Sequence, residues 1–344
     1  MILDIEPKHV DAALARQNQL LKIPGSLGML EEIGNRIAAI QRTDRPSLGK
    51  GAVVVCCADH GVTSESVAAF PDSITRIQTL NFLEGGAAIN QIALTSGADL
   101  WVVDAGVKGE EIPTHPRLVG PRVRAGTGNI ARESAMTREE AMQALDLGRK
   151  AARRAIDAGA QVLAAGDMGI GNTTPSSALT AAILGLDADL VTGRGSGMDD
   201  EGRIRKAKIV DMSVARARMV LGDLAAADPI DLLAHLGGLE IAAIAGVYLE
   251  GATRGVPLVC DGFPVTTGVL VASRLDPAVK QYLFAGHQSM EPGHAWQLRD
   301  LGLEPVFRLG LRLGEGTGAV LAFPVMRAAC QILAGMKTFA DIGM

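Results

Sequence analysis

Short apolar runs alternate along the chain with longer segments in which apolar residues recur at helical spacing. The apolar runs cover residues 52–58, 100–105, 162–165, 258–260, 282–285 and 306–309. Several are apolar at consecutive positions, as expected for strands that are covered on both faces. The helical patterns between them include residues 139–158, 175–184 and 201–224. This alternation predicts an α/β fold with a mainly parallel, Rossmann-like sheet covered by helices.

The two ends of the chain differ from this alternation. Residues 11–40 and 319–336 show helical patterns with little strand character. We expect the ends, residues 1–45 and 311–344, to form a small helical domain beside a large α/β domain of residues 46–310. Residues 109–127 are rich in proline, glycine and arginine, which predicts a long irregular connection.

Composition and charge narrow the classes of function. The 344-residue chain is 48% hydrophobic and has a net charge of −5. Its basic residues form no stripe, which argues against nucleic acid as a partner. The chain start lacks a signal pattern. The longest apolar tract, residues 318–336, contains Pro324 and Arg327, so we expect a packed helix and no membrane partner. The four cysteines form no CxxC pair, which predicts reduced thiols and a cytoplasmic protein.

The most informative segment is QVLAAGDMGIGNTTP, residues 161–175, which predicts a strand, a glycine-rich loop and a helix. Its glycines, Gly169 and Gly171 among them, allow backbone N–H groups to approach a ligand closely. Thr174 is suited to cap the helix, and Pro175 suits its first turn. The helix dipole then favours an anion such as a phosphate in the loop. The same pattern also fits a tight turn without a ligand.

Small residues and carboxylates recur where the predicted strands end, at Asp59, Asp104, Asp167 and Asp261. Ligands bind at this edge of an open parallel sheet. Aspartate and glycine also simply punctuate loops, so the pattern by itself leaves both interpretations open.

Two further glycine-rich segments contain ionisable residues. TGRGSG, residues 192–197, precedes three acids that favour the start of a helix, and then Lys206, which fits either a phosphate contact or a solvated surface lysine. In LRLGEGTGA, residues 311–319, Glu315 lies between two glycines. Desolvation there would raise the pKa of Glu315 and make it a better base, although a solvated turn glutamate fits as well.

The sequence lacks the motifs of several common kinds of catalytic and cofactor site. His287 and His294 lie seven residues apart without an HExxH or cysteine pattern, so we expect no metal. Ser289 is not part of a GxSxG elbow. The chain has no GxxxxGK[ST] loop, and no GxGxxG follows its first strand, so we expect no nucleotide cofactor.

An ordered set of motifs spans residues 24–336: PGSLGMLE, ADHGV, FPDSITRIQTLNFLEGGAAIN, GDMGIGNTT, GRGSGMDDEG, CDGFPVTTG, HQSMEPGH and LRLGEGTGA. In this order they resemble the nicotinate-nucleotide:5,6-dimethylbenzimidazole phosphoribosyltransferases of cobalamin lower-ligand assembly. The resemblance implies transfer of a phosphoribosyl group from nicotinate mononucleotide to a benzimidazole, with inversion at the anomeric carbon. It also implies a homodimer.

The resemblance assigns roles to individual residues. It makes Glu315 the base that takes the proton of the acceptor. It places the ribotide phosphate and ribose at Asp167, Gly169, Gly171, Asn172, Thr173 and Lys206. It places the benzimidazole and nicotinate at Phe70, Gln78, Met168, Ser289 and Leu313. Asp167 and Phe70 depart from the residues more often found in the family, which leaves the identity of the acceptor base open.

Two other functions fit the same glycine-rich loops. A non-catalytic nucleotide-binding regulatory protein would keep them and tolerate loss of Glu315. A nicotinate-nucleotide nucleosidase would transfer the ribotide to water and release nicotinate without any benzimidazole.

Overall fold

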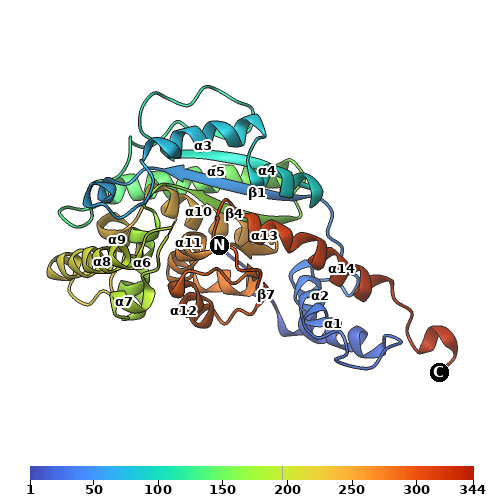
Figure 1. Ribbon diagram of the computed structural model, residues 1–344. Coiled ribbons are helices and arrows are strands. Elements are labelled where there is room, and N and C mark those ends of the chain that lie inside the picture. Colours follow the sequence, from blue (N-terminus) through green and yellow to red (C-terminus); the bar gives the residue numbers. More distant parts are fainter. Residues whose placement is uncertain (196) are drawn as a thin grey trace.

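The computed structural model describes residues 1–195 and 197–344 of the chain. Its centre is a parallel seven-stranded sheet in the order β3-β2-β1-β4-β5-β6-β7 (Figure 1), which confirms the predicted α/β fold. The strands are β1 Gly51–Ala58, β2 Ala98–Gly106, β3 Leu118–Val119, β4 Val162–Met168, β5 Leu258–Cys260, β6 Leu283–His287 and β7 Pro305–Phe307.

Helices connect these strands and form both ends of the chain. The α-helices are α1 Pro7–Gln19, α2 Met29–Gln41, α3 Ser73–Glu84, α4 Ala88–Thr95, α5 Arg138–Asp157, α6 Thr173–Leu184, α7 Ala188–Val191, α8 Asp200–Leu221, α9 Pro229–Leu236, α10 Leu239–Thr253, α11 Phe263–Leu275, α12 Pro292–Leu301, α13 Thr317–Leu321 and α14 Phe323–Gly335. Short 3-10 helices lie at Gly61–Glu65, Pro277–Tyr282 and Ala340–Ile342.

The central strands are apolar because helices cover both of their faces. Every residue of β1 is buried, which explains its run of consecutive valines and small residues. Helix α5 begins with a capping box in which Thr137 and Glu140 each satisfy a backbone N–H of the other. Its buried, largely alanine face packs against α10 and against β1 and β2.

The strand order creates a switch point between β1 and β4. From β1 the chain builds outward through β2 and β3, whereas β4 continues to β5, β6 and β7 on the other side. Residues Gly51 to Cys57 of β1 pair in register with Val162 to Met168 of β4. The loops that leave these two strands therefore diverge above and below the sheet, and open a crevice at its carboxyl edge.

Helices α1, α2 and α14, which come from the two terminal segments, group together at one end of the molecule (Figure 1). They share a small core of Ala13, Leu20, Ala38 and Leu333. Thr317–Gly335 is apolar and long enough to cross a membrane by length and composition alone, but half of it is buried and it is interrupted between α13 and α14. The prediction of a packed helix here is confirmed.

The expected irregular connection at residues 109–127 is wrong in one respect. Leu118–Val119 forms β3 and pairs with β2 at the edge of the sheet. The Arg117 guanidinium lies 4.7 Å from the centre of the Trp101 ring, and it also bonds Asp99, so tertiary contacts secure this edge. A strand of two residues is too short to show a periodic pattern.

Candidate active site

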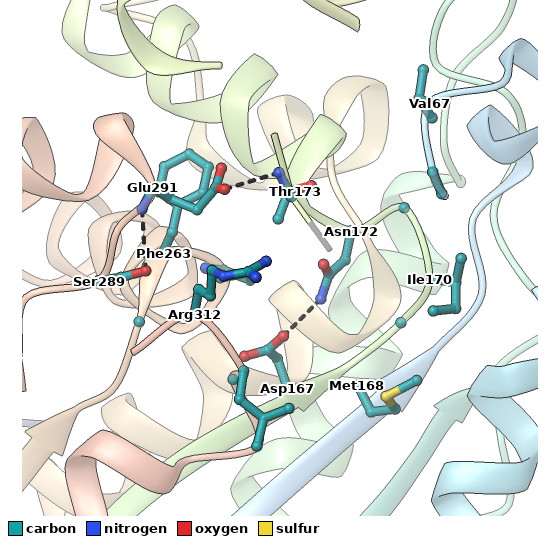
Figure 2. Close-up of a pocket in the computed structure, with 18 of the residues that line it drawn as sticks. Val67, Asp167, Met168, Ile170, Asn172, Thr173, Phe263, Ser289, Glu291 and Arg312 are labelled. Atoms are coloured by element: carbon teal, nitrogen blue, oxygen red, sulfur yellow. Dashed lines mark hydrogen bonds between the residues drawn. The ribbon is translucent and has the colours of Figure 1, made fainter. Parts of the chain in front are cut away.

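A pocket opens at the carboxyl edge of the sheet, at the switch point between β1 and β4. Its walls come mainly from the loops after β4, β5, β6 and β7, together with Val67, Ala68 and Gly195 (Figure 2). The empty volume of the pocket and its mouth is about 780 Å³. This is the place where open α/β sheets bind ligands.

The first glycine loop, residues 169–172, connects β4 to α6 at this pocket. Gly171 has a φ of +86°, which favours glycine. Helix α6 begins at Thr173 with Asn172 at the N-cap, and no side chain bonds its first N–H groups. The prediction that Thr174 caps the helix is wrong, because Thr174 lies within the first turn. The uncapped start of α6 faces the pocket and is suited to an anion.

Asp167 lies at the end of β4 and is almost completely buried. Asn172 Nδ2 donates a hydrogen bond to Asp167 Oδ2 at 2.8 Å, which ties the strand end to the start of α6. Burial, reinforced by the nearby carboxyl of Asp261, raises the pKa of Asp167 to about 8. The carboxyl is therefore mainly protonated at neutral pH and adds little negative charge beside the loop.

Lys206, on α8, is fully buried, so the alternative of a solvated surface lysine is wrong. Its Nζ donates a hydrogen bond to Thr173 Oγ1 at the start of α6, and it lies 3.3 Å from the position that a Cβ on Gly195 would occupy. Burial lowers the pKa of Lys206 to about 8. The second glycine cluster, residues 192–197, thus lies against a buried amine; its residue Ser196 is outside the described residues.

Glu291 connects this second cluster to the loop after β6. The Gly195 N–H donates to Glu291 Oε1 at 2.9 Å, and the Glu291 N–H donates to Ser289 Oγ at 3.3 Å (Figure 2). The charge of Glu291 opposes the lowering of the Lys206 pKa. Glu291 therefore couples the two loops that border this side of the pocket.

Glu315 lies in a turn with strained backbone, before α13. Gly314, Glu315 and Gly316 have φ angles of +86°, +64° and +91°, a region that only glycine adopts readily. The turn fits tightly against β4, since a Cβ on Gly166 would lie 2.1 Å from the Glu315 carbonyl oxygen. The Glu315 turn and the first glycine loop are thereby brought together from distant parts of the chain.

The Glu315 carboxyl points away from solvent, so the alternative of a solvated turn glutamate is wrong. Glu315 is only 5% exposed. Gln78 Nε2, from α3, donates to Oε1 at 2.8 Å, and the Ile89 N–H, from α4, donates to Oε2 at 3.3 Å. Burial raises the pKa of Glu315 above its ordinary value, and the two donors oppose that shift. The raised pKa makes this carboxylate a stronger proton acceptor than an ordinary glutamate.

Asp261, which follows β5, holds the Glu315 turn in place. Its carboxylate is fully buried; Oδ2 accepts from the Gly316 N–H at 3.2 Å, and Oδ1 accepts from the Ala319 N–H at 2.9 Å. His287 Nε2 lies 3.5 Å from Oδ1. These contacts fix the start of α13 and with it the strained turn.

Most of the predicted site residues meet at this pocket. Its walls include Asp167, Met168, Gly169, Gly171, Asn172, Thr173, Ser289 and Leu313. Lys206 lies behind Gly195, and Glu315 follows the wall residue Gly314. Phe70 is 53% exposed and lies outside the walls, which Val67 and Ala68 form at that end.

Phe263, Glu291 and Arg312 are wall residues that the sequence analysis did not single out. Arg312 lies in the LRLGEGTGA segment, where a basic residue beside two glycines was an available signal. Glu291 precedes Pro292, and an acid followed by proline is a recognisable helix start. Phe263 begins α11 and carries no such signal.

The chain is similar to known proteins over its full length. The chain matches a family described as phosphoribosyltransferase over residues 2–344. It is 53% identical over 340 residues to the nicotinate-nucleotide–dimethylbenzimidazole phosphoribosyltransferase of Thermus thermophilus, covering 99% of each chain. The protein of the same name from Chloroflexus aggregans is 46% identical over 340 residues, which cover 99% of this chain and 95% of the relative.

A solved structure shows the same architecture. The crystal structure of CobT from Thermus thermophilus superposes with a TM-score of 0.94 at 53% sequence identity. The superposition covers 98% of this chain and 99% of that one.

Proposed function

This chain belongs to the phosphoribosyltransferase family, and we propose that it transfers the phosphoribosyl group of nicotinate mononucleotide to 5,6-dimethylbenzimidazole. The products are α-ribazole 5′-phosphate and nicotinate, in the assembly of the cobalamin nucleotide loop. One observation carries the proposal: the buried Glu315 directly follows the wall residue Gly314 of a pocket that also contains the uncapped start of α6.

Glu315 is the proposed base. The acceptor N–H gives its proton to the Glu315 carboxylate, while the other ring nitrogen donates its electron pair to C1′ of the ribose. The bond from C1′ to the pyridinium nitrogen breaks, and its electrons neutralise the pyridinium charge. Nicotinate therefore leaves without an acid catalyst. A raised pKa supports this role, because it increases the proton affinity of the carboxylate near neutral pH.

The donor phosphate is proposed to bind at the start of α6. Gly169, Gly171, Asn172 and Thr173 form this part of the wall, and no side chain caps the helix. Lys206 lies against Thr173, where its ammonium group would pair with the phosphate. An anchored phosphate would hold the ribose in one orientation relative to Glu315.

The acceptor ring is proposed to lie between Met168 and Leu313. Both belong to the pocket wall, and Leu313 is 59% exposed, so a flat apolar ring would cover it. Gln78 is proposed to contact the acceptor beside the carboxyl that it already bonds. Phe70, two residues beyond the wall residue Ala68, is proposed to cover the mouth of this slot.

The proposed assembly is a homodimer, and the proposed compartment is the cytoplasm. The four cysteines are free and buried, which is compatible with a reducing compartment.

The test is an incubation of the protein with nicotinate mononucleotide and, in turn, dimethylbenzimidazole, benzimidazole and adenine. Mass spectrometry identifies the ribotide, and NMR of the anomeric proton gives its configuration. We expect an α-linked ribotide of dimethylbenzimidazole and an equal amount of nicotinate. Nicotinate release that is equally fast without any acceptor would instead indicate a nucleosidase, and no turnover at all would indicate a binding protein.

A further inference from the structure

The first glycine loop packs against the segment that follows β1. A Cβ on Gly169 would lie 2.4 Å from the Ala58 carbonyl oxygen and 3.1 Å from His60 Nε2. His60 is buried, and its Nε2 lies 2.9 Å from Glu240 Oε1 at the start of α10. One face of the loop is therefore supported by the ADHGV motif, residues 58–62.

A buried hydroxyl on α3 supports the next residue of this loop. The Ile170 N–H donates a hydrogen bond to Thr75 Oγ1 at 3.1 Å, and both residues are buried. Burial raises the pKa of Asp59, and hydrogen bonds from the Lys108 N–H and the Thr75 hydroxyl oppose that shift. A hydroxyl can accept one hydrogen bond while it donates another, so Thr75 connects the loop to the end of β1.

The same helix also contacts the proposed base. Gln78 follows Thr75 by three residues, and residues at this spacing lie on the same face of a helix. Gln78 Nε2 donates to Glu315 Oε1 at 2.8 Å, and Asn81 Nδ2 donates to Gln78 Oε1 at 3.2 Å. Helix α3 thus contacts the first glycine loop at Thr75 and the Glu315 turn at Gln78.

We propose that Thr75 is a positioning residue that holds the first glycine loop, through the Ile170 N–H, at a set distance from Glu315. The inference rests on the proposed function, in which this loop binds the donor phosphate and Glu315 takes the acceptor proton. Loss of the hydroxyl would leave the buried Ile170 N–H unpaired and displace the loop. A bound phosphate would then place the ribose incorrectly relative to the base.

The experiment compares wild type with Thr75→Val, which has nearly the same shape but no hydroxyl, and with Thr75→Ser, which keeps the hydroxyl. Thr79→Val is the matched control, because Thr79 is equally buried on the same helix and its hydroxyl bonds the Thr75 carbonyl oxygen rather than the loop. Isothermal titration calorimetry gives the dissociation constants of nicotinate mononucleotide, ribose 5-phosphate and dimethylbenzimidazole. Steady-state kinetics give kcat and the KM of each substrate.

Thr75→Val should weaken both phosphate-bearing probes by about 5- to 50-fold and lower kcat by about tenfold. Binding of dimethylbenzimidazole should change by less than about threefold, as should every quantity in Thr75→Ser and Thr79→Val. Equal effects of Thr75→Val and Thr79→Val would overturn the inference. A Thr75→Ser variant as impaired as Thr75→Val would also overturn it, since the hydroxyl would then not be the cause.

Amide hydrogen exchange in wild type provides a second test that does not depend on the folding of Thr75→Val. Ile170 should exchange slowly in the free protein, because its N–H is buried and bonded. Fast exchange of Ile170 would overturn the inference. Failure of the proposed function gives a different result: wild type would form no ribotide, whereas Thr75→Val would still weaken the binding of ribose 5-phosphate.

Discussion

The two sides of the pocket are built by opposite means. The side proposed to bind the phosphate, called the phosphate side below, is a strand, a loop and a helix, with Lys206 behind it. The side that holds the proposed base, called the base side below, is a turn of three consecutive residues with positive φ, and Asp261 holds it in place through two backbone N–H groups. The first follows from local sequence preferences, whereas the second exists only because tertiary contacts impose it.

Burial affects the ionisable groups of the two sides in the same way. It lowers the pKa of the Lys206 amine to about 8 and raises the pKa of the Glu315 carboxyl, so each charged form is disfavoured. For Lys206, a bound phosphate would reverse the effect. For Glu315, the same effect increases basicity. The comparison indicates that the phosphate side is suited to a negative charge supplied by the substrate. The base side is suited to accept a proton from the substrate.

Glu315→Gln breaks the base side alone and should have the largest effect. We expect kcat to fall by about 10²- to 10⁴-fold, the usual loss on removing a general base. The dissociation constant of nicotinate mononucleotide should not change, since Glu315 contacts Gln78 and Ile89 rather than the phosphate side. Single-turnover kinetics measure the catalytic rate, and calorimetry measures the dissociation constant of nicotinate mononucleotide. Glu304→Gln, an exposed carboxylate, is the control; a Glu315→Gln variant with wild-type kcat would remove the proposed base.

Lys206→Met breaks the phosphate side and should raise the donor KM by about 10- to 100-fold, the loss of a charged hydrogen bond. The change in kcat should be smaller. Lys208→Met, an exposed neighbour on α8, provides the matched control. Steady-state kinetics with varied nicotinate mononucleotide decide the matter, and an unchanged KM would exclude Lys206 from phosphate binding.

Asp167→Asn tests the effect of burial on the phosphate side through the pH dependence of protein stability. The folded-state pKa of Asp167, about 8, exceeds the ordinary value of 3.8, so the folded protein keeps a proton that the unfolded chain releases. Stability is therefore lost as pH rises between these values, and the penalty is complete above pH 8. Asparagine cannot ionise, so the variant should have a higher free energy of unfolding than wild type at pH 8, by about 1–3 kcal/mol. This gain is smaller than the full energy of the pKa shift, which is about 1.4 kcal/mol for each pKa unit.

Urea unfolding at pH 5 and at pH 8 measures this difference. Asp223→Asn, at an exposed aspartate, should show no pH-dependent gain. A gain for Asp167→Asn that is equal at both pH values would contradict a buried, proton-binding carboxyl.

Gln78→Ala should have the smallest effect, a shift of the pH profile. The Gln78 donor lowers the pKa of Glu315, so its loss raises that pKa further. The base works only when deprotonated, and the acidic limb of kcat should therefore move to higher pH, with a loss of a few fold on that limb. Ile77→Ala on the same helix is the control. A uniform loss at every pH would indicate that Gln78 contributes only to acceptor binding.

Local patterns predicted the parts of the molecule that depend on local physics. The apolar runs located the long strands, and Gly171, Asn172 and Thr173 at the end of one of them do line the pocket. Strand β3 escaped, because Leu118 and Val119 pair at the edge through contacts with distant residues.

Burial of isolated polar residues could not be predicted in the same way. Residue types alone were compatible with a solvated Lys206 and a solvated Glu315, and both are buried. Their burial results from the fit of α8 against α6 and of the Glu315 turn against Gly166. Arg312 is the opposite case: it lies in a motif already singled out for Glu315, but its direction into the pocket is visible only in three dimensions.

The ionisation of Glu315 tests the central claim most directly. Its carboxyl can be titrated by carbon NMR on glutamate-labelled protein, with the resonance assigned by its disappearance in Glu315→Gln. The account predicts a midpoint above the ordinary 4.5 and an acidic limb of kcat that follows this midpoint. A midpoint at or below 4.5, as for a carboxylate in open water, would contradict it.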